Sequence, residues 1–336
     1  MSSPKSRVET IDILRGVLAC AVMFYHYVTW YKPPFPDALL GVLHTIGIYS
    51  VEAFFVVSGF SLYYSYRDDR DTLAYARNRF LRLWPVYVLA VAGCAWLTPN
   101  LSKLQIVENT TLLFGFYDAT RSLVIGGWSI AVEVVLSALA PLLILFTARR
   151  LHRASVLFVV ALVAMLTWEI TNPYTWATHV NPVNHLAFFV SGMMLAEARL
   201  RRWQLRPVPF LVVLIGALGA AAGASLFGRT WEDVSFGPVR VVVTFATIGF
   251  VGALALYQIE HPSRAALSIG AASYSIYLLH PIFWGLLIRS YVGWWVPVVA
   301  AILTVLLSIL CYRWIERPII NWGKSWRGTG KELRPR

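Results

Sequence analysis

The chain has 336 residues, of which 58% are hydrophobic and only 14% are charged, and its 29 Lys and Arg outnumber its 17 Asp and Glu. Soluble globular proteins carry about 25% charged residues, so this composition excludes a single soluble core and predicts a membrane protein with many spans. The net charge of +12 is compatible with nucleic-acid binding, but its distribution along the chain argues against nucleic acid as a partner.

Apolar runs long enough to cross a bilayer, about 17 to 25 residues, recur ten times. They are predicted at 11–31, 46–66, 79–98, 127–148, 155–171, 182–198, 208–227, 238–257, 268–290 and 293–315. The stretch 103–117 is apolar but short, as is typical of an interfacial or re-entrant segment. The predicted fold class is therefore all-α: a polytopic membrane protein of about ten transmembrane helices. Residues 1–320 form the transmembrane domain and residues 321–336 a basic tail, expected to be disordered from Lys324 onward.

An even number of spans places both termini on one side of the membrane. Of the 29 Lys and Arg residues, 22 then lie in segments on that side and six on the other, among them Arg240, while Arg15 lies within a span. Because cytoplasmic segments carry the excess of basic residues, both termini are expected in the cytoplasm. The surplus charge then faces anionic membrane lipids, which explains it without nucleic acid.

The first span carries two polar side chains in the otherwise apolar stretch IDILRGVLACAVMFYHY at 11–27. Arg15 and His26 are eleven residues apart, about three helical turns, so both lie on one stripe of the helix, about 16 Å apart along its axis. In the predicted orientation Arg15 is near the cytoplasmic face and His26 in the outer half of the membrane. Charged and polar residues within spans commonly face bundle interiors or aqueous cavities and mark functional sites. The alternatives are that Arg15 only extends its charged end to the membrane surface and that His26 only forms a hydrogen bond with a neighbouring helix.

Two glutamates share the predicted depth of His26. Glu52 lies at the outer end of the second span, in VEAFFVVSGF, and Glu133 lies in GGWSIAVEVV of the fourth. A carboxylate beside His26 would raise its basicity and fix its tautomer, as a general base requires, and the sequence leaves open which glutamate does so. Ser58, followed by Gly59, is either a functional hydroxyl or part of a small-residue helix contact.

A basic cluster, RNRFLRLWP at 77–85, opens the third span on the cytoplasmic side. Arg79 and Arg82 are three residues apart and share a helix face. Together with Arg77 they are suited to clamp a phosphate-bearing ligand, because arginine forks match phosphate oxygens; plain anchoring at the membrane face is the alternative. No P-loop or Gly-rich dinucleotide motif occurs, which argues against a nucleotide-hydrolysing pump. The three cysteines lack metal-ligand spacing, so no metal site is predicted.

Six motifs, in order along the chain, resemble those of the membrane acyltransferase 3 family, integral-membrane enzymes that acylate bacterial surface glycans and some small molecules. They are the Arg15–His26 pair, FFVVSGF at 54–60, the Arg79–Arg82 pair, WSIAVE at 128–133, SYSIYLLHP at 273–281 and YRWIERP at 312–318. The resemblance implies an O-acetyltransferase of the bacterial cytoplasmic (inner) membrane. WSIAVEVV lacks the second acidic residue and the aromatic residue that many relatives carry after the glutamate, which leaves Glu133 as the sole carboxylate of its motif.

The resemblance also implies how an acyl donor binds. Acetyl-CoA, or another acyl-CoA, is expected as a co-substrate from the cytoplasm rather than as a permanently bound cofactor. Its phosphates would bind the Arg-x-x-Arg pair, Arg79 and Arg82, together with Arg77. Its pantetheine arm would then enter the helix bundle past Arg15.

The family's catalytic histidine maps onto His26 and its partner arginine onto Arg15. His26 would either deprotonate the acceptor hydroxyl or accept the acyl group first, with Glu52 or Glu133 orienting the imidazole. Ser58 and Arg15 are candidates for stabilising the oxyanion.

The predicted acceptor is a hydroxyl of a surface or exported glycan on the outer side of the membrane, and a small secreted metabolite such as a macrolide is the alternative. The rival class is a transporter or flippase, which should show inverted repeats that the sequence does not contain. Association of the chain into a homo-oligomer is left open.

Two further features are weaker. His280, near mid-membrane in YLLHPIF, either lines the channel or packs in the core. The tryptophans of the outer side, among them Trp30, Trp176 and Trp231, are expected to form an aromatic belt, with stacking on sugar rings as the alternative.

Overall fold

The structure is a computed structural model that describes residues 8–31, 36–69, 71–98, 100–227, 230–288 and 295–329. Within these ranges the chain is helical, with no strand, which confirms the predicted all-α class. Ten long helices coincide with the ten predicted spans. They are α1 (Glu9–Tyr31), α2 (Asp37–Tyr66), α3 (Thr72–Leu97), α5 (Gly127–Thr147), α6 (Leu151–Thr171), α8 (Val183–Leu200), α9 (Pro207–Ser225), α11 (Gly237–Leu256), α13 (Ser273–Ile288) and α14 (Val296–Cys311).

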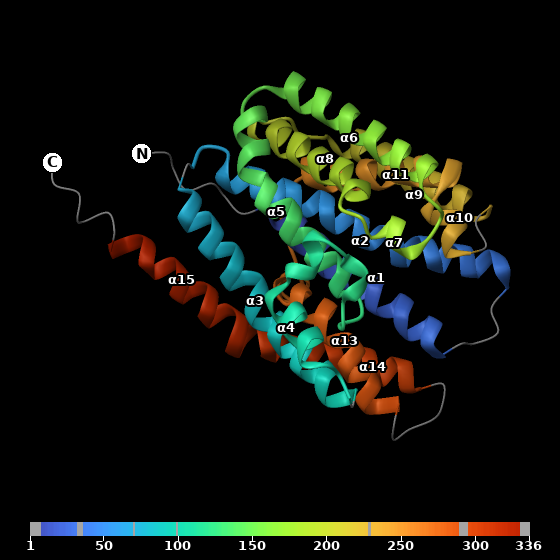
Figure 1. Cartoon of the computed structure of the whole chain (residues 1–336). Helices are drawn as coiled ribbons and strands as arrows, with labels where there is room; N and C mark the ends of the chain where they lie inside the picture. The colour runs from blue at the N-terminus through green and yellow to red at the C-terminus, as the bar shows by residue number, and fades with distance from the viewer. Residues whose placement is uncertain are drawn as a thin grey trace.

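Shorter helices connect or extend these elements. They are α4 (Lys103–Thr111), α7 (Trp176–His179), α10 (Trp231–Ser235), α12 (Arg264–Ala271) and α15 (Arg317–Thr329). In Figure 1, α1, α2 and α5 lie between an upper group formed by α6, α8, α9 and α11 and a lower group formed by α3, α4, α13, α14 and α15. The predicted short segment at 103–117 is helix α4 followed by a 3₁₀ turn, too short to cross a bilayer.

By length and apolar character, eight helices of the described residues can cross a membrane, or nine when α12 and α13, bent by 67°, are counted as one span. The protein is therefore a polytopic membrane protein. Helix α8, the predicted sixth span, is less apolar because it includes Asn184, His185, Glu197 and Arg199. It is enclosed by α2, α6 and α11, so little of its surface has to face lipid.

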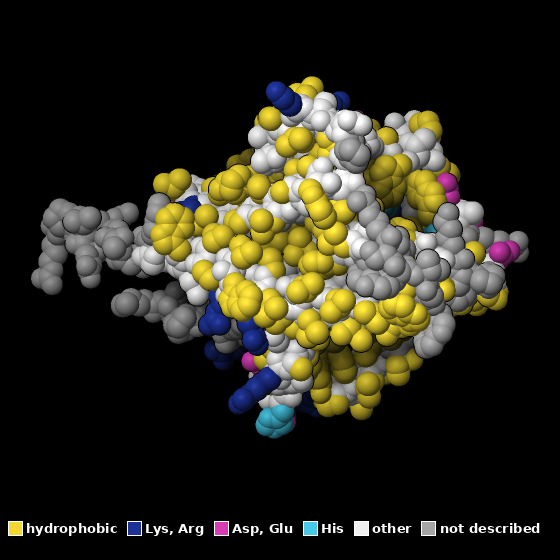
Figure 2. All heavy atoms as spheres, turned by 90° about the horizontal axis from the view of Figure 1, so that it is seen from below, with side chains coloured by type: hydrophobic (Ala, Val, Ile, Leu, Met, Phe, Trp, Pro, Cys, Tyr) yellow, Lys and Arg dark blue, Asp and Glu magenta, His cyan; other side chains and the backbone are white. Residues whose placement is uncertain are grey.

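The outer surface fits a bilayer. Large apolar side chains such as Leu142, Val159 and Val212 are exposed on α5, α6 and α9, and contiguous apolar surface of this kind marks membrane contact. Figure 2 shows one face covered mostly by apolar side chains, with Lys and Arg side chains mainly at its lower and upper edges.

The expected disordered tail is wrong in its first part. Helix α15 packs along α3 and continues to Thr329 (Figure 1), so residues 324–329 are helical. Residues 330–336 of the predicted tail lie outside the described residues.

Helices α2 and α8 approach each other closely because glycines face the contact. A Cβ atom on Gly59 would lie 1.9 Å from the carbonyl oxygen of Phe189, and one on Gly192 would lie 1.9 Å from the carbonyl oxygen of Val56. Small residues allow helix backbones in membranes to approach in this way. Gly59 of the SGF motif therefore serves a helix contact, and this contact places α8 beside the polar residues of α2.

We expect Gly59→Ala to destabilise the fold, because the added methyl group has to push α2 and α8 apart. Overpacking of this kind costs about 1–3 kcal/mol, and the thermal unfolding midpoint of the purified protein in detergent should fall. Gly216→Ala in α9 is the matched control, because no atom lies within 4 Å of the Cβ position there. Equal midpoints for the two variants would contradict the close contact.

Candidate active site

His26 on α1 forms a hydrogen-bonded pair with His280 on α13. Nδ1 of His26 lies 2.9 Å from Nε2 of His280, and the stacked rings have centroids 5.0 Å apart. Nδ1 of His280 lies 2.7 Å from the carbonyl oxygen of Tyr277. A carbonyl only accepts, so His280 carries its hydrogen on Nδ1, and in the neutral ring Nε2 accepts from Nδ1–H of His26. Nε2 of His26 is left with a lone pair, as a general base or nucleophile requires.

The His–Pro dipeptide explains why this arrangement forms. Pro281 has no N–H, so the carbonyl of Tyr277, four residues earlier, has no donor within the helix. Nδ1–H of His280 supplies that missing donor. A proline within a helix usually costs stability. In α13, the proline instead sets the tautomer of the buried His280.

Neighbouring helices hold the two histidines in place. The hydroxyl of Tyr27 donates to the carbonyl oxygen of His280 at 2.8 Å and lies 2.6 Å from the hydroxyl of Thr304 on α14. The indole of Trp30 stacks on His26 with centroids 4.9 Å apart, which is a more specific role than the aromatic belt expected for it. The pair is thereby fixed from α1, α13 and α14.

Glu133 is occupied by other partners. Its Oε1 accepts from Nη2 of Arg79 at 2.5 Å and from Oγ of Ser58 at 2.9 Å, and Arg79 also donates to Oγ of Ser137. The hydroxyl hydrogen of Ser58 is therefore directed at a carboxylate, and Ser58 positions Glu133 rather than offering a free donor to an oxyanion.

Glu52 belongs to a separate buried cluster. Its Oε2 lies 2.8 Å from Nδ1 of His185, and its Oε1 lies 3.7 Å from Nη1 of the fully buried Arg240, which also pairs with Glu169 at 2.5 Å. Arg240, counted above among residues outside the membrane core, is thus an interior residue. The prediction that a glutamate orients His26 is wrong, because equal depth does not place side chains on facing sides of their helices.

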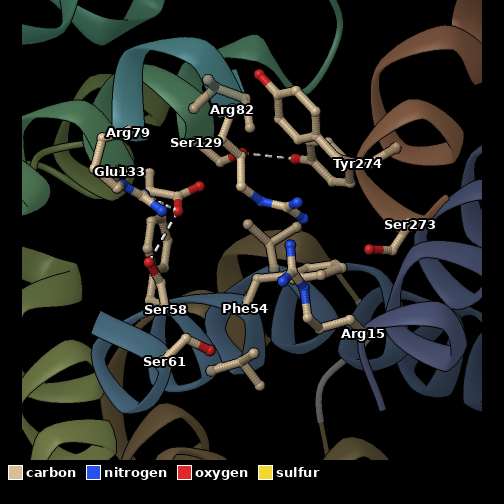
Figure 3. A pocket seen from close by; sticks show the side chains of 15 residues that line it. Arg15, Phe54, Ser58, Ser61, Arg79, Arg82, Ser129, Glu133, Ser273 and Tyr274 are labelled. Atoms are coloured by element: carbon tan, nitrogen blue, oxygen red, sulfur yellow. Dashed lines mark hydrogen bonds and ion pairs between the residues drawn. The ribbon is translucent and has the colours of Figure 1, made fainter. Parts of the chain in front are cut away.

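A first cavity, here called the arginine cavity, lies where α1, α2, α3, α5 and α13 meet and has a volume of about 70 Å³ (Figure 3). Its polar lining consists of Arg15, Ser58, Ser61, Arg79, Arg82, Ser129, Glu133, Ser273, Tyr274 and Tyr277. The guanidinium groups of Arg15 and Arg82 point towards each other across it (Figure 3). Arg82 pairs with Glu316 at 3.4 Å, whereas Arg15 has no carboxylate within ion-pair distance among the described residues.

A second space of about 250 Å³, here called the basic entrance, adjoins the arginine cavity. The two share Arg15, Ser61, Arg79 and Arg82. The basic entrance reaches Tyr66 at the end of α2 and Asn78 near the start of α3. Arg77 lines neither space, so the structure brings together Arg15, Arg79 and Arg82 and leaves Arg77 outside.

A third space of about 410 Å³, here called the histidine pocket, contains His26 in its wall. It shares two lining residues, Val51 and Tyr277, with the arginine cavity, so these two side chains form the partition between them. The hydroxyl of Tyr277 lies 2.8 Å from Oγ of Ser129 and 3.1 Å from the carbonyl oxygen of Gly126. Gly126 has φ +80, and a Cβ atom there would lie 2.9 Å from the Tyr277 hydroxyl.

The structure therefore assigns places to residues that the sequence ranked low or missed. His280 was a minor candidate, and Tyr277 and Ser129 were not singled out. The signal that points to His280 and Tyr277 is Pro281, because a proline within a span leaves a carbonyl free four residues earlier.

The fold and site define a class of polytopic helical proteins with an oriented imidazole in one cavity and arginines in the neighbouring one. The chain belongs to the acyltransferase 3 family: residues 8–313 match the family model, described as an acyltransferase domain. It is a membrane O-acyltransferase, which decides between the enzyme and the rival transporter or flippase.

The curated relatives include proteins of two rhizobia and a staphylococcus. Exopolysaccharide production protein ExoZ of Rhizobium meliloti is 29% identical over 309 residues, covering 85% of this chain and 93% of that protein. Nodulation protein 10 of Rhizobium leguminosarum is 25% identical and covers 93% of each chain. O-acetyltransferase OatA of Staphylococcus aureus is 26% identical, covering 96% of this chain but 58% of OatA. No solved structure matches the chain.

We expect His280→Leu to lower kcat about 10- to 100-fold, because the hydrogen bond that orients His26 is lost. The KM for the acyl donor should stay unchanged, since His280 lines neither the arginine cavity nor the basic entrance. His280→Gln should recover part of kcat, because its amide oxygen can accept from Nδ1–H of His26. Steady-state kinetics of acyl transfer test this, and equal activity of the Leu and wild-type proteins would refute the orienting role.

Proposed function

We propose that this O-acyltransferase moves an acetyl group from cytoplasmic acetyl-CoA to a hydroxyl of a surface or exported glycan on the opposite side of the membrane. The observation that carries the proposal is the placement of the two cavities. One is lined by guanidinium groups, the other by an oriented imidazole, and Val51 and Tyr277 line both. A donor in the first and an acceptor in the second would therefore lie next to each other at these two residues.

The arginine cavity is suited to the phosphate-bearing donor. Two guanidinium groups facing each other repel unless an anion lies between or beside them, and arginine binds phosphate oxygens through paired hydrogen bonds. Serines such as Ser61 and Ser129 alternate in the wall with apolar residues such as Phe54, which matches the amide and methylene groups of a pantetheine arm.

The proposed orientation follows from the basic residues. The basic entrance opens at the end of α2 and the start of α3, where the sequence carries much of its excess of Lys and Arg. The positive-inside rule assigns that end to the cytoplasm, together with both termini. We assign the protein on this basis to the bacterial cytoplasmic membrane.

The proposed chemistry is direct transfer with His26 as general base. The acceptor hydroxyl oxygen attacks the thioester carbonyl carbon while its proton moves to Nε2 of His26. The tetrahedral intermediate then collapses, the carbon–sulfur bond breaks, and the departing thiolate of CoA takes that proton from the imidazolium. His280 holds the ring throughout, because its Nε2 accepts from Nδ1–H of His26 in both protonation states. The location of His26 in the wall of the histidine pocket supports this role, because the acceptor is proposed to enter there.

The relatives support a glycan as acceptor. ExoZ is named for exopolysaccharide production and OatA as an O-acetyltransferase. Hydroxyl groups of a polymer or of a lipid-linked repeat unit would reach His26 from the far side of the membrane, where export delivers them.

Sealed membrane vesicles test the direction and the catalyst together. Inverted vesicles, which expose the cytoplasmic face, should release free CoA from added acetyl-CoA, whereas right-side-out vesicles should not. In His26→Ala, release should fall by about 100- to 10,000-fold, the usual contribution of a general base. CoA release from right-side-out vesicles alone would reverse the orientation, and release undiminished by His26→Ala would refute the mechanism.

We expect Arg15→Ala to raise the KM for acetyl-CoA by about tenfold or more, because one charge-assisted hydrogen bond to phosphate contributes about 1.5–3 kcal/mol. Arg264→Ala, which removes an exposed arginine at the start of α12, is the matched control and should leave the KM unchanged. An equal KM for all three proteins would show that the donor does not bind in the arginine cavity.

A further inference from the structure

Three tryptophans and a histidine form one wall of the histidine pocket, here called the aromatic wall: Trp128 of α5, Trp176 and His179 of α7, and Trp231 of α10. The rings of Trp128 and Trp176 lie 5.5 Å apart at 78°, and those of Trp176 and Trp231 lie 5.8 Å apart at 79°. Successive indoles are thus nearly perpendicular. The ring of His179 contacts all three.

The two short helices that carry most of this wall have four and five residues. Helices this short do not hold their shape in isolation, because nucleation costs more than one turn of hydrogen bonds returns. Something else has to hold them. The buried cluster around Arg240 does so, and this explains why ionised groups lie in the protein interior.

Helix α7 is held through its carbonyl groups. Nε2 of His185 lies 2.9 Å from the carbonyl oxygen of His179, and Nδ2 of Asn184 donates to the carbonyl oxygen of Thr178 at 2.6 Å. Nδ1 of the same His185 faces Glu52 at 2.8 Å. The imidazole of His185 thus connects Glu52 of α2 to the backbone of α7.

Helix α10 is held in the same way. Nη1 of Arg240 donates to the carbonyl oxygen of Ser235 at 3.0 Å, and the hydroxyl of Tyr49 donates to the carbonyl oxygen of Val234 at 2.8 Å. Nη2 of Arg240 also donates to the carbonyl oxygen of Asn184. One guanidinium group therefore connects α10 to the start of α8, next to the segment that carries α7.

His179 keeps unused hydrogen-bonding capacity. It is buried in the wall, and its Nδ1 has no hydrogen-bond partner among the described residues, although buried polar atoms in native proteins rarely lack one. Burial, together with the positive charge of Arg240, holds the pKa of His179 well below its usual range. The ring is therefore neutral near pH 7 and suited to an uncharged hydroxyl.

We propose that the aromatic wall is a subsite for a pyranose ring of the acceptor, pre-organised by the buried cluster of Glu52, Glu169, His185 and Arg240. The apolar C–H face of the sugar stacks on Trp176 and Trp231, because aromatic faces carry negative and C–H groups positive partial charge. The hydroxyl rim of the sugar meets the polar lining, which includes His44 and His179. This inference rests on the proposed function, which supplies a glycan as acceptor.

An entirely apolar occupant fits this wall less well. A lipid chain would leave Nδ1 of His179, which has no hydrogen-bond partner among the described residues, unsatisfied. A sugar ring has apolar faces and a polar edge, and these match the two kinds of lining residue. Because His26 lines the same pocket, a hydroxyl of the bound sugar or of the next sugar in the chain would lie near this base.

Binding of defined oligosaccharides tests the subsite without the reaction. Full-length protein in lipid nanodiscs, free of sugar-based detergent, is titrated calorimetrically with cellotetraose, maltotetraose and chitotetraose. We expect the wild type to bind at least one of these oligosaccharides saturably. The affinity should fall about fivefold or more in Trp176→Ala and in Trp231→Ala, because each variant loses one stacking contact; about 1.4 kcal/mol corresponds to a factor of ten in affinity. Trp176→Phe should retain most of the affinity because it keeps an aromatic face.

Trp96→Ala is the matched control, because it removes an exposed tryptophan of α3 that does not line the pocket. Its affinity should equal that of the wild type. The proposal is overturned if the wild type binds none of the three oligosaccharides, or if Trp176→Ala and Trp231→Ala bind as the wild type does.

Kinetics separate this proposal from the proposed function. If the wild type transfers acetyl groups but both alanine variants keep its KM for the acceptor, the subsite is wrong and the function stands. If the wild type releases no CoA with any acceptor while the oligosaccharides still bind at the aromatic wall, the function is wrong and the subsite stands. Unchanged KM for acetyl-CoA in the variants shows that they remain folded.

Discussion

The site depends on one missing hydrogen-bond donor. Because Pro281 has no N–H, the carbonyl of Tyr277 is free to accept from His280, and that contact decides which nitrogen of His280 accepts from His26. An amide N–H at position 281 would donate to the carbonyl oxygen of Tyr277 instead. The imidazole of His280 could then adopt either tautomer. The same device recurs in α5, where Pro141 frees the carbonyl of Ser137, and the hydroxyl of Tyr75 fills it at 2.7 Å.

Two groups of buried charges serve different purposes. In the cluster around Arg240, the guanidinium group pairs with Glu169 and Glu52, His185 faces Glu52, and the cluster holds backbone in place. In the arginine cavity, Arg79 and Arg82 pair with Glu133 and Glu316, whereas Arg15 has no carboxylate within ion-pair distance among the described residues. Under the proposed function, Arg15 would bind the anionic donor.

Much of the fold and part of the site could be predicted from the sequence. The lengths of the apolar runs predicted the positions of the ten long helices. Helical periodicity predicted that Arg15 and His26 lie on one stripe of α1, and in the structure both side chains line cavities. The partner of His26 was beyond reach, since hydropathy gives depth in the membrane but not the direction a side chain faces across the bundle. Glu52 has the right depth, yet the Gly59 contact turns α2 so that it meets α8 instead. Helices α7 and α10 are too short to leave a periodic pattern, so their tryptophans looked like a belt.

The partition formed by Val51 and Tyr277 has a consequence for the cell that houses this protein. A chain hollowed from two faces risks becoming a leak, and a leak through an energised bilayer dissipates the electrochemical gradient that drives transport and ATP synthesis. The hydroxyl of Tyr277 donates to the carbonyl oxygen of Gly126 and lies within hydrogen-bond distance of Oγ of Ser129, which fixes the tyrosine in the partition. Under the proposed function, an acyl group would pass towards the other aqueous compartment while protons and metal cations stay where they are.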